Sequence, residues 1–363
     1  MQFGLNENQV MLRDSAREFF AAECPPAVVR RLMDSDTAYD AALWAKLASQ
    51  GYTGIIFDEA YEGVGLGLVE LALLMEEAGR TLLPGPLFST VALAGAVIDA
   101  CASQEQKATY LTPIARGDAR ATLALLESTA SWDTADLRMT SSGGKLSGEK
   151  LFVPDAAVAE FIVVVCRDSV HVVDRAAGGV TIAPMTAMDA TRRLSMVSLR
   201  DVASEALANP QGIARGLSIA TAALAAEMVG GMQRTLDLTV DYAKTRKQFG
   251  KPIGMFQAVQ HQCADMYLET ESARSAAYYA AWALQEAAAD AAAAVSIAKL
   301  YASDAARTVG NRGIQVHGGM GFTWENDLHL YYRRAKASET TLGDATFHRE
   351  RLARLVIDAP VSR

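Results

Sequence analysis

The period of the apolar residues changes twice along this chain, and this change constrains the fold more than any other feature. Residues 1–117 and 211–363 carry helical patterns, whereas residues 118–210 carry short runs rich in β-branched residues. Helices, then a small sheet, then a second set of helices form an α+β arrangement. We therefore predict three domains with these bounds: helical, β and helical.

Start and stop signals place the individual helices. Asn6 can cap the first helix, and Cys24-Pro25-Pro26 is expected to end it because proline lacks an N–H. In the last zone, Gly230-Gly231 interrupts the composition of one long helix. The other predicted helices cover residues 39–50, 69–78, 89–100, 105–115, 217–244, 257–286 and 291–311, and a last helix begins near Thr346.

The middle zone is predicted to form short strands. The expected strands are residues 121–126, 161–166, 170–173 and 179–183, each bounded by Gly, Asp or Ser. Between the first two, Ser141-Ser142-Gly143-Gly144 is typical of a hairpin turn.

Charge and hydrophobic content exclude several classes of function. The chain has 34 basic and 42 acidic residues, which argues against a general nucleic-acid binder because such proteins need a basic surface. We find no run of about 18 apolar residues that predicts a membrane span, and Met1–Glu7 lacks the features of a signal peptide. The four cysteines have no metal-ligand spacing, so no metal site is predicted. These features predict a cytoplasmic protein with reduced thiols.

Two motifs in the last zone suit the binding of phosphate. The first, Thr245–Gln257, contains Arg246, whose guanidinium offers planar paired donors and keeps its charge. The second, Gly313–Phe322, contains Gly318-Gly319, where backbone amides can approach a phosphate because no Cβ intervenes. Taken singly, Arg246 could equally be a solvated cation at a helix end, and the glycine pair could be a helix C-cap and turn.

With both motifs in this order, the chain resembles the acyl-CoA dehydrogenase family of flavoenzymes. Asn6-Glu7-Asn8-Gln9 near the start and Glu76–Arg80 followed by Pro84-Gly85-Pro86 extend the resemblance over essentially the whole chain. The resemblance implies an N-terminal helical domain, a central β-barrel or sandwich domain and a C-terminal four-helix bundle, assembled as a tetramer built from dimers. It also implies the family's chemistry: a proton leaves Cα of an acyl-CoA thioester, and a hydride leaves Cβ for FAD.

In the family, both motifs reach across a dimer interface to the FAD of the partner chain. The residues that the resemblance assigns to FAD are Arg246 at the pyrophosphate, Phe249 and Gln257 beside the cofactor, and Gln315, Gly318 and Gly319 at its ADP half.

The glutamate that serves the family as catalytic base is missing. Leu342 occupies the usual position, and leucine cannot accept a proton. Some members carry the glutamate on the helix before the first motif, where this chain has Ala220. Glu227 and Glu339 remain as candidates, although an ion pair with an Arg or Lys is the favoured interpretation of each.

Other titratable residues of the last zone have weaker assignments. The family offers an aspartate and an arginine to bound CoA, and Asp237 and Arg234 are the candidates here. His317 and His348 are expected to be structural, because the family mechanism assigns them no proton transfer.

The segments that would hold a flavin in this chain's own β domain also depart from the family. A Thr-Glu-Pro segment is here Leu126-Glu127-Ser128, and a Trp-Ile-Thr segment is here Phe152-Val153-Pro154. Proline offers neither a hydroxyl nor an N–H to the flavin. This chain therefore retains the family's residues that reach a partner's FAD site, whereas it lacks the family's residues that hold a flavin in its own β domain.

This asymmetry favours a subunit that lacks the base in a mixed tetramer, as found in some bacterial members of the family. The partner chain would supply the glutamate, and an electron-transfer flavoprotein would accept the electrons in fatty acid or steroid catabolism. Three alternatives stay open: a self-sufficient homotetramer that uses Glu227 or Glu339, a non-enzymatic scaffold without flavin, and a flavin monooxygenase on the same fold.

Overall fold

The computed structural model describes residues 4–358, so Met1–Phe3, part of the segment predicted not to be a signal peptide, lies outside the described residues. The chain forms two compact units. Residues 4–28, 72–83 and 221–358 form the helical unit, and residues 29–71 and 84–220 form the mixed unit. These units divide the chain differently from the predicted domain bounds, which stay a prediction.

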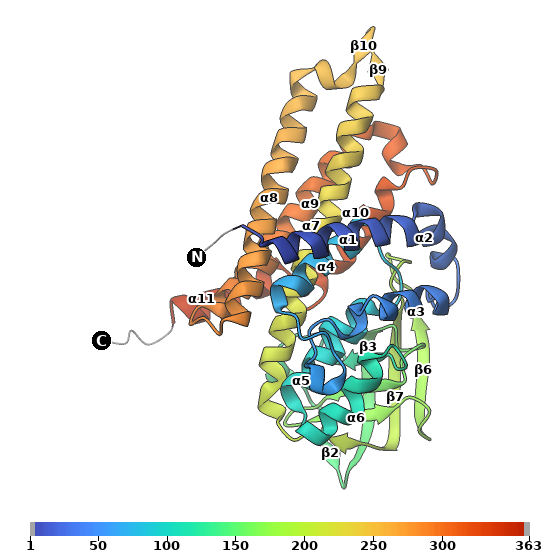
Figure 1. Ribbon diagram of the computed structural model, residues 1–363, viewed down its shortest axis with the longest axis vertical. Helices are drawn as coiled ribbons and strands as arrows, with labels where there is room; N and C mark the ends of the chain where they lie inside the picture. The colour runs from blue at the N-terminus through green and yellow to red at the C-terminus, as the bar shows by residue number, and fades with distance from the viewer. Residues whose placement is uncertain (1–3, 359–363) are drawn as a thin grey trace. The chain divides into compact units, whose positions relative to one another are not determined.

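The helical unit is built on long antiparallel helices. Figure 1 shows α7 (Ile213–Thr245), α8 (Gln257–Gln285) and α9 (Ala291–His317) running side by side, with the small hairpin of β9 and β10 at one end. α10 (Leu328–Thr340) and α11 (Ala345–Val356) pack on α9. The unit also contains α1 (Glu7–Glu23) and the last part of α4 (Leu68–Arg80). This arrangement confirms the predicted C-terminal helical bundle.

Alanine allows α8 and α9 to pack closely. One face of α8 and one face of α9 bury small side chains at a spacing of four residues, which places them on a single stripe. Short side chains at a helix contact permit a small interaxial distance. The buried alanines at this spacing are Ala273, Ala277 and Ala281 on α8 and Ala294, Ala298 and Ala302 on α9.

The mixed unit contains two four-stranded sheets. In the first, β1 (Ala121–Ala124) runs parallel to β4 (Phe161–Val165), followed by the antiparallel strands β5 (Val170–Asp174) and β8 (Glu205–Ala206). The second is antiparallel, in the order β2 (Ser141–Ser142), β3 (Lys145–Pro154), β7 (Leu194–Ala203) and β6 (Val180–Met185). Buried side chains from both sheets form one core cluster, which confirms the predicted central β region.

The mixed unit also contains several helices. They are α3 (Ala41–Ser49), α5 (Ala96–Cys101), α6 (Gln104–Ala115), the π-helix η3 (Phe88–Gly95) and most of α2 (Pro26–Met33). Short 3₁₀ turns complete the chain: η1 (Tyr52–Gly54), η2 (Glu59–Tyr61), η4 (Thr134–Asp136), η5 (Pro210–Gly212), η6 (Ile253–Met255) and η7 (Gly318–Phe322).

Several elements differ from the sequence prediction for physical reasons. Pro26 was expected only to end a helix, but it opens α2, because the first helical position needs no N–H. α10 was not predicted, since four of its thirteen residues are charged. β3 and β7 were missed as well, because polar residues alternate with the buried ones along both strands.

α7 continues without a break through Gly230-Gly231. By length and composition, the helical stretch Pro210–Thr245 could cross a membrane, but 72% of its most apolar window is buried inside the protein. Its apolar side chains therefore serve the interior of the fold, as in the core helix of a soluble protein.

Candidate functional site

A tight hairpin follows α7 and holds an aromatic side chain in solvent. β9 (Lys247–Gln248) and β10 (Lys251–Pro252) are joined by Phe249-Gly250, with φ values of 52° and 78°. Positive φ at both central residues is the pattern of a type I′ turn, which phenylalanine adopts only with strain. Phe249 is nevertheless 91% exposed, more than any other large hydrophobic side chain among the described residues. Such a strained, exposed aromatic residue suits a contact outside this chain.

The fold brings the two sequence motifs together around one open pocket of about 450 Å³. The end of α7 and the hairpin contribute one side, and the end of α9 with η7 contributes the other. The lining residues are Tyr242, Arg246, Gln248, Ile253, Val316, His317, Gly318, Gly319 and Met320.

Arg246 offers this pocket an unpaired positive charge. Its backbone is fixed, because its N–H donates to the Tyr242 carbonyl at 2.8 Å and its carbonyl accepts from the Ile253 N–H at 2.8 Å. Its side chain is exposed and has no ion pair or hydrogen bond with the described residues. A guanidinium in this state can bind an anion without first breaking another contact.

The glycine pair opposite leaves the backbone bare. Gly318 caps α9 with a φ of 58°, which glycine adopts at little cost. A Cβ added to Gly318 or Gly319 would meet no atom within 4 Å, so open space adjoins the backbone there. Arg246 and these glycines together suit a phosphate-bearing ligand.

The remaining predicted cofactor residues lie outside this lining. Gln257 is exposed at the first position of α8, and Gln315 is exposed on α9. Sequence reasoning did not select Tyr242, although it precedes Arg246 by four residues and thus shares its helix face. That spacing was the signal that could have found it.

Leu342, at the position of the family's glutamate, presents no group that can take a proton. It is 6% exposed, has a φ of 58° and lies in the loop between α10 and α11. His348 Nε2 donates to the Leu342 carbonyl at 2.9 Å, and Lys299 Nζ donates to the carbonyls of Gly343 and Glu339 at 2.8 and 3.0 Å. The loop thus keeps a defined shape around an apolar side chain.

Acid is expected to weaken the fold through His348. Burial, helped by the positive charge of Lys299, lowers the His348 pKa from 6.5 to about 4. Between pH 6.5 and pH 4, His348 is protonated in the unfolded chain but stays neutral in the folded chain. The free energy of unfolding that is present above pH 6.5 is therefore lost as the pH falls toward 4. The loss amounts to about 3 kcal/mol. Urea unfolding midpoints between pH 7 and 4.5 should fall less for His348→Gln, and an identical pH dependence in both proteins would contradict this role.

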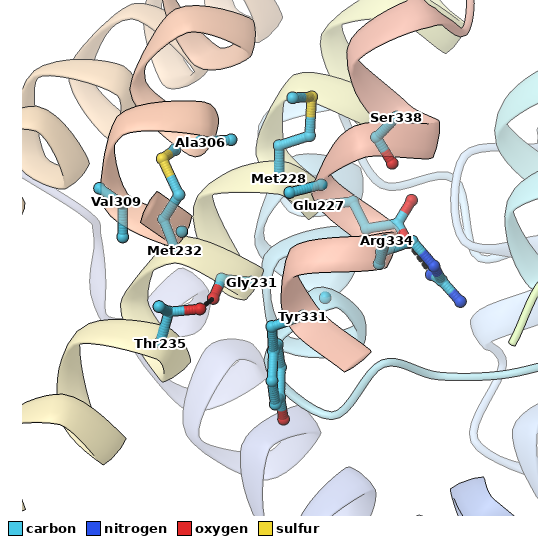
Figure 2. A pocket seen from close by; sticks show the side chains of 13 residues that line it. Glu227, Met228, Gly231, Met232, Thr235, Ala306, Val309, Tyr331, Arg334 and Ser338 are labelled. Carbon is cyan, nitrogen blue, oxygen red and sulfur yellow. Dashed lines mark hydrogen bonds and ion pairs between the residues drawn. The ribbon is translucent and has the colours of Figure 1, made fainter. Parts of the chain in front are cut away.

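Glu227 lines a small enclosed cavity, where it is tied to a cation. Figure 2 shows the Glu227 and Arg334 side chains pointing toward each other, and Arg334 Nη1 donates to Glu227 Oε1. Both residues are about 5% exposed or less. The centre of a water molecule can occupy about 20 Å³ of this cavity. That volume is enough for one water molecule and too little for an acyl chain. The geometry is that of a structural ion pair.

Glu339 is held in the same way by two cations. Arg307 Nη1 donates to its Oε1 at 2.8 Å and Lys336 Nζ to its Oε2 at 3.0 Å. Lys336 lies on α10 with Glu339, and Arg307 comes from α9, so the favoured interpretation of an ion pair with an Arg or Lys agrees with these contacts. For the CoA candidates, Asp237 accepts from Arg80 at 2.9 Å, so it is also paired within the chain.

The β-domain segments that would cradle a flavin are used internally. Glu127 accepts from Lys150 Nζ at 2.8 Å and from the N–H groups of Arg138 and Met139 at 2.8 and 3.1 Å. Pro154 ends β3, and its carbonyl accepts from the Thr122 hydroxyl. The Thr122–Pro154 contact joins β1 of the first sheet to β3 of the second. Pro154 itself has no hydroxyl or N–H to offer a ligand.

Two family models and a known relative match most of this chain. The family model described as "Acyl-CoA dehydrogenase, N-terminal domain" matches residues 6–118, and "Acyl-CoA dehydrogenase, C-terminal domain" matches residues 212–357. The chain is 35% identical over 338 residues to acyl-CoA dehydrogenase IpdE2 of Mycobacterium tuberculosis, covering 93% of each protein.

Solved structures show the same fold. A Tcur3481–Tcur3483 steroid ACAD variant has a TM-score of 0.90 at 32% identity, covering 97% of this chain and 98% of that one. PigA with FAD and proline has a TM-score of 0.89 at 25% identity, covering 98% and 99%. The predicted three-part fold is therefore confirmed.

Proposed function

Because this chain belongs to the acyl-CoA dehydrogenase family, we propose that it is the subunit of a mixed tetramer that completes a partner's FAD site and supplies no catalytic base. Its relatives indicate that it is an oxidoreductase, and its structural neighbours, which include FAD-bound structures, indicate that the cofactor is FAD. The division of labour between two chains is the new element of this proposal.

One observation carries the proposal: the cofactor-binding groups are free while the carboxylates are engaged. Arg246 has no partner among the described residues and shares a pocket with Gly318 and Gly319. Glu227 and Glu339 are each held by Arg or Lys. A subunit built in this way can bind an anionic cofactor but has no free base to offer.

The residues of the helical unit fit the nucleotide half of FAD. Bound FAD would accept the electrons through its other half, the flavin. Arg246 would hold the pyrophosphate, and Phe249 would bury its exposed ring against the cofactor or the partner chain. Gln257, Gln315, Gly318 and Gly319 complete the proposed set. The absence of a hydroxyl and an N–H at Pro154 supports the proposal that the partner holds the flavin half.

We assign the remaining roles to the assembly. A related chain with the usual glutamate would take the Cα proton of an acyl-CoA, and an electron-transfer flavoprotein would receive the electrons in the cytoplasm. Mixed complexes occur among the neighbours, including the ChsE4–ChsE5 complex of M. tuberculosis at 25% identity. The steroid ACAD neighbour supports a steroid-derived acyl group as the substrate class.

Flavin content tests this proposal directly. The chain purified alone is expected to be colourless, and the chain co-expressed with a homologous dehydrogenase that carries the glutamate is expected to bind FAD. In that assembly, Arg246→Ala should release flavin, whereas Lys247→Ala, the adjacent exposed cation outside the pocket lining, should not. The measurement is the visible spectrum and the ratio of flavin to protein.

Turnover separates this proposal from a self-sufficient enzyme. Glu227→Gln and Glu339→Gln in this chain are expected to leave acyl-CoA oxidation by the assembly intact. Stoichiometric FAD and turnover in the chain alone would overturn the proposal. In that case, the glutamate whose replacement abolishes turnover would be the base.

A further inference from the structure

His317 is held firmly at the wall of the pocket that contains Arg246. It is the last residue of α9 and is 6% exposed. Its ring stacks on Tyr242 of α7, with centroids 4.3 Å apart and planes inclined by 20°. Its Nδ1 lies 2.8 Å from the Gly313 carbonyl oxygen, one helical turn earlier. The stack fixes the ring plane and the hydrogen bond fixes its rotation.

This hydrogen bond also assigns the tautomer. A carbonyl oxygen can only accept, so Nδ1 carries the proton and Nε2 carries a lone pair. Burial lowers the His317 pKa from 6.5, which keeps the ring neutral at neutral pH. Nε2 has no hydrogen-bond partner among the residues that the structure describes. His317 therefore brings an unused, uncharged acceptor to the pocket.

The pocket thus combines two different recognition groups. Arg246 is the one charged side chain in its lining, and no carboxylate belongs to that lining. A bare phosphate would satisfy Arg246 but would meet a lone pair at His317 Nε2. The fitting ligand carries a phosphate together with an uncharged hydrogen-bond donor, as a nucleotide does.

We propose that His317 Nε2 accepts a hydrogen bond from the nucleotide half of FAD, either from the adenine amino group or from a ribose hydroxyl, while Arg246 holds the phosphate. This inference rests on the proposed function and adds a binding residue to it. It also revises the expectation that His317 is only structural.

The test uses the flavin-bound assembly with two variants of this chain. His317→Phe keeps a flat ring on Tyr242 and removes the acceptor, whereas His317→Gln keeps an oxygen that can accept. FAD should bind about three- to tenfold more weakly to the phenylalanine variant, and the glutamine variant should recover most of this loss. Flavin fluorescence during dilution measures the affinity, and the thermal midpoint of each flavin-free protein checks the fold. Equal affinity in all three proteins would overturn the inference.

The pH dependence separates a neutral acceptor from a cation. The charged and titratable groups that line the pocket beside His317 are Arg246 and Tyr242, both on or next to α7, and the η7 side contributes none. Wild-type affinity should fall in acid as Nε2 takes a proton, and His317→Phe should lack this fall. Tighter wild-type binding in acid would mean that His317 binds phosphate, which would overturn the inference.

Two cofactor analogues identify the donor. Replacing adenine by hypoxanthine removes the amino group, and a deoxyribose analogue removes a hydroxyl. One of them should bind the wild type less tightly than FAD does, whereas His317→Phe should bind that analogue and FAD equally well.

The Arg246→Ala variant separates failure of this inference from failure of the proposed function. If neither Arg246→Ala nor His317→Phe changes FAD binding, the proposed function fails as a whole. If Arg246→Ala weakens FAD binding and His317→Phe does not, only the role of His317 fails.

Discussion

Replacing Arg334 with methionine is expected to destabilise the helical unit by about 3–5 kcal/mol, because it leaves a buried carboxylate without its counterion. Glu227 is 4% exposed and Arg334 is 5% exposed, so bulk solvent cannot take over the lost contact. The side chain of methionine nearly fills the space of the arginine stem, so the lost charge contributes more to this effect than a cavity does.

Thermal unfolding at a fixed protein concentration measures the effect, since association shifts the apparent midpoint. A matched control is Arg333→Met, one residue earlier on α10, where the guanidinium lies over the exposed Trp324 ring and about 1 kcal/mol or less is at stake. Adding Glu227→Gln to Arg334→Met should restore part of the stability. Equal thermal midpoints for Arg334→Met and Arg333→Met would contradict this explanation.

This ion pair also connects the helix that carries Ala220 with the helix that precedes Leu342, the two positions at which family members carry the glutamate. Glu227 belongs to α7 and Arg334 to α10, and α10 leads directly into the loop of Leu342. Lys299 and His348 hold the same loop from α9 and α11. Hydrogen bonds thus hold the loop around a position that has no proton acceptor, as the proposed role of supporting a partner's site requires.

Apolar periodicity was sufficient to predict the order of helical and β regions and most of the long helices. It was insufficient where burial depends on contacts distant in sequence. The buried positions of α10 include His329, Arg334 and Ser338, so its helical stripe is too polar to stand out. Lys150 is fully buried inside a strand whose pattern looks exposed, because Glu127, 23 residues away, neutralises it.

The candidate site shows the same limit. Local motifs predicted Arg246, Gly318 and Gly319 because each has a chemistry that its own sequence neighbours reveal. Tyr242 and His317 stack on each other from different helices, so only the packing of α7 against the end of α9 shows their role. The pairing of Glu339 with Arg307 likewise depends on how α9 and α10 pack.

Gly230→Ala is expected to destabilise the protein by about 3 kcal/mol, although alanine is the better helix former. A Cβ at Gly230 would lie 1.8 Å from the Glu76 carbonyl oxygen and 2.8 Å from the Arg80 nitrogen. These are backbone atoms of α4, so one of the two helices must move. The contact is reciprocal, because a Cβ at Gly79 would lie 2.0 Å from the Glu227 carbonyl oxygen.

The neighbouring glycine provides the control. A Cβ at Gly231 meets nothing closer than the Gly79 carbonyl oxygen at 4.0 Å, so Gly231→Ala should be neutral or should stabilise the protein by up to about 1 kcal/mol. Thermal midpoints of the two variants should therefore move in different directions from the wild type, or at least differ by several degrees. Equal midpoints would contradict a close crossing of α4 and α7.

Glu227 lies on α7 at this crossing, so Gly230→Ala should also loosen the pairing of Glu227 with Arg334. The double variant Gly230→Ala and Arg334→Met should therefore lose less stability than the sum of the losses in the two single variants.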